Sequence, residues 1–165
     1  MRGVNATFMS ERELKIKYSE YSSLDELAAG DRALALSAIE AIDGSYAPYS
    51  HFNVGAAVLL DDGTIVKGAN QENAAYPSGL CAERTAMFAA GAAYPDRNMN
   101  AIAVAAKQNG NICPEPAAPC GACRQVMAQY QTKAGHPVSV ILVGSEKILK
   151  FSRVDDLLPF IFDKI

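Results

Sequence analysis

The stretches CAERTAMFAAG at residues 81–91 and PCGACRQ at residues 119–125 decide the fold and the chemistry of this chain. A helix is expected from Cys81 to about Gly91, because this run is rich in alanine and ends at a glycine. A second helix is expected from Cys120 to about Thr132. A cysteine at a helix N-terminus favours the thiolate, because unpaired backbone N–H groups and the helix dipole stabilise negative charge. Both stretches therefore predict a metal-binding or reactive thiolate at the start of a helix.

Segments with the periodicity of strands surround these two helices. Alternating apolar residues predict a strand over 52–60, which the turn at 61–63 joins to a partner strand over 64–68. Further elements are expected as strands at 101–106, 139–143 and 147–151 and as a helix from Asp31 to about Asp43. Strands that alternate with helices predict a three-layer α/β sandwich, with a mixed sheet covered by helices on both faces.

The ends of the chain are expected to add little to this core. Residues 1–25 form an N-terminal extension of the single domain 1–165, with residues 1–12 loosely ordered and a short strand over 14–18. A short helix after Ser152 is expected to stop before Pro159. Loops are expected at 69–80 and 107–119.

Composition and charge limit the classes of function. The chain has 165 residues and a formal net charge of −3, and its fifteen Lys and Arg residues form no cluster. This argues against a nucleic-acid partner, since phosphate binding needs a grouped basic surface. The N-terminus lacks a basic-then-apolar signal pattern, so we expect a cytoplasmic protein. The longest apolar stretches, 101–106 and 138–143, are too short to span a bilayer, so no membrane partner is expected.

Three of the four cysteines are candidates for metal ligands. In a chain of this size without a signal pattern, cysteines indicate metal binding or catalysis before disulfide formation. Thiolates at Cys81, Cys120 and Cys123 suit Zn²⁺, which takes sulfur at about 2.3 Å and keeps a fourth position for water in catalytic sites. Glu83 follows a ligand by two residues and is expected beside that water without binding the metal.

The negative charge of a three-thiolate zinc site favours positively charged side chains beside it. Three thiolates on Zn²⁺ leave one negative charge, which makes a bound water less acidic. Arg84 and Arg124 directly follow the ligand-bearing segments. We therefore expect both arginines to offset this charge by donating to the sulfurs.

Two other interpretations of the cysteines stay open from the residues alone. The pair Cys120 and Cys123 at a helix start is also typical of a redox dithiol. Alternatively, Cys113 could complete a closed four-cysteine zinc module without enzymatic activity. The first interpretation gives no role to Cys81 and Glu83, and the second gives none to Glu83 or to the polar segment 70–76.

Five motifs stand out between about Tyr46 and Phe162: APYSHFNVGAA at 47–57, NQENAAY at 70–76, CAERTA at 81–86, PCGACRQ at 119–125 and LLP at 157–159. Over this range the chain resembles the cytidine deaminases of the small, homotetrameric type. Zinc deaminases combine His/Cys/Cys or three-cysteine ligands with a glutamate that does not bind the metal. Cys81 stands where many of them have histidine, so the all-cysteine version applies.

The resemblance implies a fold and a set of roles. It implies a mixed five-stranded sheet with flanking helices, and one zinc per chain. The residues implied to bind substrate are Asn70 and Glu72 at the ribose 3′-hydroxyl, Phe52 packed on the nucleoside, the Ala82 N–H at the pyrimidine O2, and Phe162 reaching the site of a neighbouring subunit.

The activity expected on these grounds is hydrolytic deamination of cytidine and deoxycytidine to uridine and deoxyuridine in pyrimidine salvage. Zinc-bound hydroxide attacks C4 of the ring, and Glu83 shuttles the protons. The partners expected are a small nucleoside and three further copies of the chain in a homotetramer. An alternative is deamination of another aminopyrimidine-like compound, such as a nucleoside antibiotic.

Overall fold

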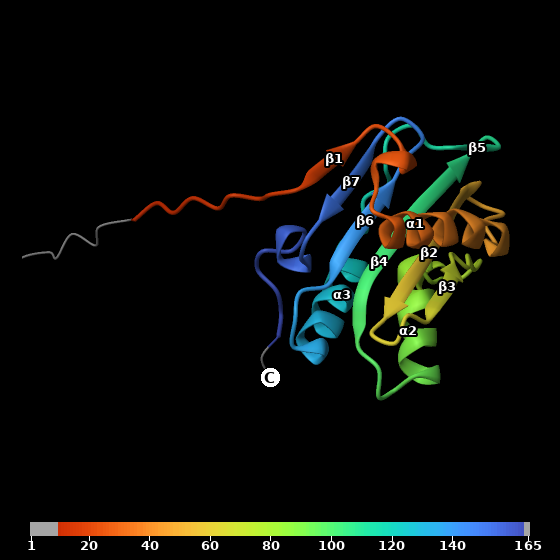
Figure 1. The fold of residues 1–165 in the computed structure, drawn as a ribbon. Coiled ribbons are helices and arrows are strands. Elements are labelled where there is room, and N and C mark those ends of the chain that lie inside the picture. The colour runs from red at the N-terminus through yellow and green to blue at the C-terminus, as the bar shows by residue number, and fades with distance from the viewer. Residues whose placement is uncertain (1–9, 164–165) are drawn as a thin grey trace, which may run out of the picture.

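The computed structural model describes residues 10–163 and has an open mixed β-sheet at its centre (Figure 1). The order of the strands across the sheet is β1-β7-β6-β4-β2-β3, and β5 pairs with β4 alone. The strands are β1 (Ser19–Tyr21), β2 (Phe52–Leu60), β3 (Ile65–Ala69), β4 (Met99–Gln108), β5 (Asn111–Ile112), β6 (Ser139–Val143) and β7 (Ile148–Phe151). The helices are α1 (Ala29–Ala41), α2 (Ala82–Ala93) and α3 (Gly121–Ala134).

Two crossover connections place α2 and α3 against the sheet. Strand β2 is antiparallel to both β3 and β4, so α2 connects two strands that run the same way on either side of β2. Strand β4 is parallel to β6, with Ala101 opposite Ser139, and α3 is the crossover between them. Because both helices follow this pattern, their N-termini lie at the same edge of the sheet.

Alternation along β4 separates two apolar layers. Ile102 and Val104 pack with residues of α2 and α3, including Met87 and Met127. The alanines between them, such as Ala103, pack with α1 on the opposite face. The predicted three-layer α/β sandwich with a mixed sheet is therefore confirmed. The sheet has seven strands where five were expected, because short strands β1 and β5 add to the core.

The close contact between β3 and α2 depends on a glycine. A Cβ atom at Gly68 would lie 2.3 Å from the backbone nitrogen of Ala86. Real Cβ atoms do not approach backbone that closely, so only glycine permits this spacing. Gly68 therefore sets how near the first half of α2 lies to the sheet.

The boundaries of α1 and the 107–119 loop differ from the predictions. Helix α1 begins at Ala29 rather than Asp31 and continues into a 3₁₀ turn at Ile42–Gly44. Gly30 does not stop it, because the first turn of a helix tolerates glycine at a modest cost. Strand β4 extends to Gln108, and a two-residue turn pairs it with β5 inside the predicted loop.

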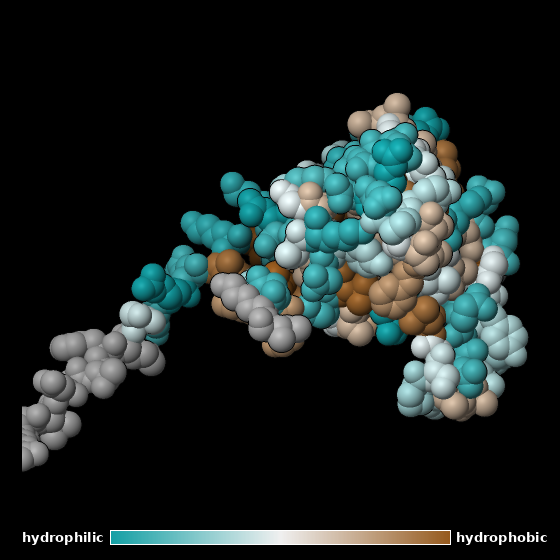
Figure 2. Space-filling view, turned by 90° about the horizontal axis from the view of Figure 1, so that it is seen from below, coloured by the Kyte–Doolittle hydropathy of each residue, from teal (hydrophilic) through white to brown (hydrophobic). Residues whose placement is uncertain are grey.

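The N-terminal strand lies later than predicted. Leu14, Ile16 and Tyr18 are largely exposed, and pairing with β7 starts only at Ser19. Strand β7 ends at Phe151, whose ring contacts that of Tyr18, so among the described residues, residues 10–17 pair with no strand. Figures 1 and 2 show this segment running away from the body as an arm. Alternation alone was a wrong guide here, because a strand also needs a partner. Residues 1–9 of the predicted loosely ordered start lie outside the described residues.

The surface is mostly polar, and the C-terminal segment contains little regular structure. Polar side chains cover most of the face in Figure 2, with apolar side chains in smaller patches. The predicted helix after Ser152 is one 3₁₀ turn, Val154–Asp156. Within residues 10–163 every helix falls short of the length and apolar character needed to cross a membrane.

Candidate active site

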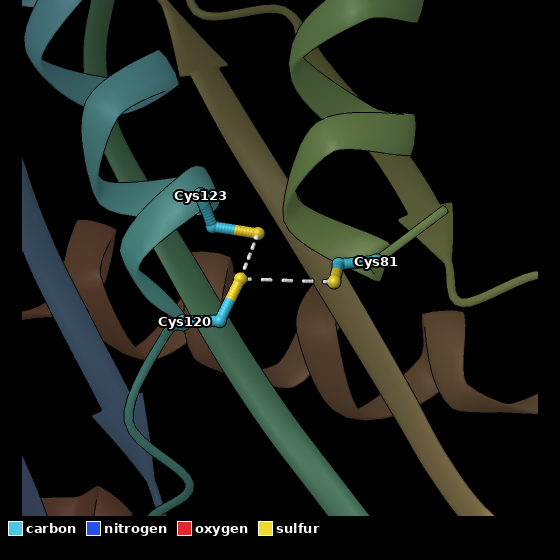
Figure 3. A group of neighbouring side chains, drawn as sticks. All are labelled: Cys81, Cys120 and Cys123. Atoms are coloured by element: carbon cyan, nitrogen blue, oxygen red, sulfur yellow. Dashed lines mark hydrogen bonds between the residues drawn. The ribbon is translucent and has the colours of Figure 1, made fainter. Parts of the chain in front are cut away.

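Three cysteine sulfurs converge where α2 and α3 begin (Figure 3). Cys81 and Cys120 are the N-cap residues of their helices, and Cys123 lies in the first turn of α3. The sulfurs of Cys81 and Cys120 are 4.0 Å apart, and those of Cys120 and Cys123 are 3.4 Å apart. All three lie within 4.8 Å of one another. The two crossovers therefore bring a pair of helix termini and their thiols to one point.

The geometry and chemistry of these sulfurs fit a zinc ion. Ligands at about 2.3 Å from a tetrahedral zinc are about 3.8 Å apart, and the observed separations bracket that value. Cys123 is buried, Cys81 half-buried and Cys120 exposed, so one side of the group is open. Cys113, also within the described residues, stays outside the group, and its N–H donates to the carbonyl of Ala106. The donor set is thus three thiols with an open side, which is the pattern of a catalytic site.

Charge around the thiols favours one ionised sulfur. A hydrogen bond from Cys123, together with the Arg84 guanidinium, lowers the pKa of the Cys81 thiol to about 5. The Nη2 atom of Arg84 lies 3.6 Å from Cys81 Sγ. The same hydrogen bond with Cys81, and then burial, raise the pKa of Cys123. The Cys81 thiol is therefore ionised more readily than the Cys123 thiol.

The two arginines that follow the ligand segments take different positions. Arg84 faces the sulfurs, as the distance above shows, and its buried Nε has no hydrogen-bond partner among the described residues. Arg124 donates instead to the carbonyls of Pro119 and Leu157, at 2.8 and 2.9 Å. The expectation that Arg124 donates to a sulfur was therefore wrong, because its guanidinium ties the loop before Cys120 to the C-terminal segment.

Glu83 is buried beside this group. Its side chain comes from the first turn of α2, and only 5% of the residue is exposed. Burial is the largest cause that raises the pKa of its carboxyl, and the charge of Cys81 acts in the same direction. A carboxyl with a raised pKa holds a proton more readily near neutral pH, which is what a general acid–base needs.

Two loops next to the thiols are joined by backbone hydrogen bonds. The N–H of Tyr46 donates to the carbonyl of Asn70 at 2.9 Å, and the N–H of Glu72 donates to the carbonyl of Tyr46 at 2.8 Å. The side chain of Asn70 extends this connection: its Oδ1 accepts from the N–H of Val54, and its Nδ2 donates to the carbonyl of Phe52, both at 2.9 Å. Asn70 thus fixes the start of β2 against the 70–76 segment.

These elements enclose a cavity of about 280 Å³. The predicted site residues that line it are Phe52, Asn70, Glu72, Cys81, Ala82, Glu83 and Cys120. They come from β2, from the loop after β3 and from the starts of α2 and α3. The fold therefore gathers onto one cavity seven residues from four separate segments of the sequence.

Comparison with protein families agrees with this arrangement. Residues 29–143 match the model of the cytidine and deoxycytidylate deaminase zinc-binding region.

The chain belongs to the family of cytidine and deoxycytidylate deaminases.

Similar proteins include the cytidine deaminase of Halalkalibacterium halodurans, 47% identical over 125 residues that cover 76% of this chain and 88% of the relative. The cytidine deaminase of Mycobacterium tuberculosis is 36% identical over 128 residues, covering 76% and 84%. Among solved structures, cytidine deaminase from Burkholderia pseudomallei gives a TM-score of 0.67 at 43% identity, covering 79% of this chain and 97% of that one.

Family membership decides between the interpretations of the cysteines. A zinc-binding deaminase has an open catalytic site, so the redox dithiol and the closed four-cysteine module are set aside. The predicted zinc cofactor is confirmed, and the protein is a zinc-dependent hydrolase of this family. The open side of the thiol group and the buried carboxylate of Glu83 agree with that chemistry.

Phe162 lies outside the cavity of its own chain. It is 70% exposed, and Gln125 holds its backbone from both sides. The Nε2 atom of Gln125 donates to the Phe162 carbonyl at 2.7 Å, and the Phe162 N–H donates to Oε1 at 3.2 Å. In this deaminase α3 and its N-cap thus carry two thiols, and α3 also anchors the C-terminal segment.

Sequence reasoning missed Ser50, which lines the cavity, and Gln125, which anchors Phe162. Gln125 lies within the quoted motif 119–125, but a glutamine after a metal ligand gives no sign of what it contacts. Ser50 has hydrogen bonds to Glu72 and Phe52. A serine in a turn is ordinary, so only its place in the motif 47–57 pointed to it.

Proposed function

We propose that this protein hydrolyses cytidine and deoxycytidine to uridine and deoxyuridine, with release of ammonia. The observation that carries the proposal is the shared cavity, where a buried carboxylate and a three-thiol metal site face residues able to bind a sugar and a base. The relatives named cytidine deaminase, at up to 47% identity, support the same substrate class.

Glu83 is proposed to move the protons of the reaction. Bound zinc lowers the pKa of a coordinated water to about 7 and so supplies a nucleophile near neutral pH. Glu83 accepts a proton from the attacking water and delivers it to N3 of the ring as C4 is attacked. It later helps the amino group leave as ammonia. Its burial supports this role, because a raised pKa lets one carboxyl both hold and release a proton.

The charge of the site supports the role of Arg84. Its guanidinium lies beside Cys81 and offsets part of the negative charge of three thiolates. Less negative charge on the ligands makes a bound water more acidic. We therefore assign charge compensation to Arg84 alone.

The remaining residues are proposed to hold the nucleoside. Ala82 is the first residue of α2, where a backbone N–H has no partner within the helix and is free to meet the pyrimidine O2. Phe52 packs on the nucleoside. Asn70 and Glu72 bind the ribose 3′-hydroxyl, and both lie in the loop that the Tyr46 hydrogen bonds fix beside the metal ligands.

The carboxylate of Glu72 favours a nucleoside over a nucleotide. The family includes deaminases of deoxycytidylate, which carries a phosphate. A carboxylate in the sugar-binding part of the cavity repels a nearby phosphate. Hydrogen bonds from Ser50 and Tyr49 lower the pKa of Glu72 and keep it ionised.

The proposed function also includes a homotetrameric assembly and a cytoplasmic location. We propose a homotetramer in which Phe162 of each chain reaches the site of a neighbour. Its exposed side chain and its backbone, fixed by Gln125, support this role. We also propose that the protein acts in the cytoplasm, in pyrimidine salvage, because its proposed substrates are pyrimidine nucleosides.

A direct assay tests the proposal. Purified protein is mixed with cytidine, deoxycytidine or deoxycytidylate, and loss of the cytidine absorbance band is followed with and without a zinc chelator. We expect turnover of both nucleosides, abolished by the chelator, and little turnover of the nucleotide. Preference for deoxycytidylate, or full activity after verified zinc removal, would overturn the proposal.

A further inference from the structure

The turn before β2 surrounds the carboxylate of Glu72 with donors. The N–H groups of Tyr49 and Ser50 donate to Oε2 at 2.9 and 3.3 Å. The hydroxyl of Ser50 donates to the other oxygen, Oε1. Both carboxylate oxygens are thus held by two consecutive residues that are distant from Glu72 in the sequence. This leaves the carboxylate little freedom to rotate.

The direction of the Ser50 hydroxyl is also fixed. The N–H of Phe52 donates to Ser50 Oγ at 3.1 Å. A hydroxyl has one proton and two lone pairs. An ionised carboxylate has no proton to give, so the Ser50 hydroxyl is the donor to Oε1 while its oxygen accepts from Phe52. One hydroxyl therefore links the residue proposed to pack on the nucleoside with the residue proposed to bind its sugar.

The backbone between these residues takes an uncommon conformation. His51 has φ of +55°, in the left-handed region that residues other than glycine seldom occupy. A hydrogen bond from its N–H to the carbonyl of Ala47, at 3.1 Å, closes the turn. Such strain persists only where the surroundings hold it, and it clusters at ligand sites. The turn places Ser50 between Glu72 and the start of β2.

We propose that Ser50 is a positioning residue for sugar recognition: it holds Glu72 as an oriented, ionised acceptor for a substrate hydroxyl. This rests on the proposed function of Glu72 as the ribose-binding carboxylate. An ionised carboxylate offers about four lone-pair sites and no proton. The turn uses three, so one acceptor site of Glu72 remains, and both Glu72 and Ser50 line the cavity. The ligand chemistry selected there is a neutral hydroxyl donor.

Loss of the Ser50 hydroxyl is expected to weaken substrate binding rather than to slow the chemical step. A carboxylate that is already fixed loses less freedom when substrate binds. Ser50 touches neither the thiols nor Glu83 through any hydrogen bond of the described residues, so the proton transfers are left intact. Removing the Ser50 hydroxyl should raise KM for substrates with a ribose 3′-hydroxyl and leave kcat almost unchanged.

The experiment compares Ser50→Ala, Ser50→Thr and the control Ser37→Ala in the full-length zinc enzyme. Ser37 donates only to a backbone carbonyl on α1. Each variant is assayed with cytidine and with 2′,3′-dideoxycytidine, after zinc content and Tm are matched to wild type. For cytidine we expect Ser50→Ala to raise KM about three- to tenfold with kcat within about twofold, and Ser50→Thr and Ser37→Ala to stay near wild type. For the dideoxynucleoside, Ser50→Ala and wild type should have the same KM.

Several results would overturn the assignment. They are an unchanged cytidine KM in Ser50→Ala, an equal rise in KM for the dideoxynucleoside, or a Ser50→Thr variant as weak as Ser50→Ala. The variant Glu72→Gln distinguishes the positioning role of Ser50 from the ribose-binding role of Glu72. If Glu72→Gln leaves the cytidine KM unchanged, the role of Glu72 itself fails. If Glu72→Gln raises KM and Ser50→Ala does not, only the role of Ser50 fails.

Discussion

Glu83 stands apart from the other charged residues of the described chain, because it is the one that the fold buries. A carboxylate loses hydration when buried, so such a group is kept only where its charge or its proton has a use. Here it lines the same cavity as Cys81 and Cys120. Its environment therefore agrees better with proton transfer than with a structural role.

Replacing Glu83 by Gln separates proton transfer from metal binding. Glutamine keeps nearly the same volume and hydrogen-bonding reach but cannot shuttle protons. We expect the variant to fold, keep its zinc and bind cytidine, with turnover lower by at least the ~10²–10⁴-fold typical of one general acid–base. Zinc content, cytidine binding and turnover are measured on one sample, with the exposed Glu40→Gln as control. Zinc loss would make Glu83 a ligand, and near-normal turnover would remove its role.

The four cysteines should respond unequally to substitution. Cys81→Ala, Cys120→Ala and Cys123→Ala each remove one thiol of the metal group and should lower zinc content and stability, because metal binding contributes to folding. Cys113→Ser should leave zinc and turnover at wild-type values, since its sulfur is outside the group. Metal analysis of the four purified variants checks this. Loss of zinc from Cys113→Ser would restore the four-cysteine interpretation.

At the level of elements, the position of α2 depends on its contact with β3. Gly68→Ala would place a Cβ against backbone of α2, and backbone cannot move aside like a side chain. We expect it to destabilise the protein by about 1–3 kcal/mol and to lower zinc occupancy, because α2 carries Cys81. Denaturant unfolding and zinc analysis measure both effects.

Gly30 provides the matched control for this substitution. It lies in the first turn of α1, where an added Cβ would meet nothing within 4 Å. Gly30→Ala should therefore stabilise the protein, by about 0.4–1 kcal/mol, by restricting the unfolded chain. If both alanine variants shifted stability in the same direction, the close approach at Gly68 would not be the cause.

The sequence predicted the elements that carry the metal better than those at the edges of the sheet. Helices α2 and α3 begin one residue after the cysteines expected to start them, because an N-cap and an alanine-rich run are local signals. The strand expected over 14–18 was wrong, since pairing with β7 depends on where β7 ends. Strand β5 has two residues, which is too short for any periodicity.

The candidate site shows the same division between local and long-range information. The thiols and Glu83 were predictable because their spacing along the chain encodes their chemistry. The direction of Arg124 was not, because adjacency to a ligand does not say which carbonyls approach from the C-terminal segment. The donors around Glu72 depend on a turn more than twenty residues earlier in the sequence, where only the folded chain reveals the contact.

For the molecule as a whole, the assembly is testable in solution. Phe160 and Phe162 are 90% and 70% exposed in the single chain, and contact with a neighbouring chain would remove this apolar surface from water. We expect light scattering to give the mass of four chains. Phe162→Ala should retain zinc and the fold but raise KM for cytidine, if the ring completes a neighbour's site. A fully active monomer would contradict both the tetramer and this role of Phe162.

The convergence of two crossovers on one metal also constrains the order of folding. Cys81 and Cys120 are 39 residues apart in sequence. Strand β4 lies between them in the chain and must join the sheet before the two sulfurs can come into contact. Contacts at such separation form late, because the entropy of closing the loop has to be overcome first. The ion therefore finds its three ligands only in a chain that is already nearly native. Zinc bound to the completed sheet then shifts the folding equilibrium toward the native state by mass action.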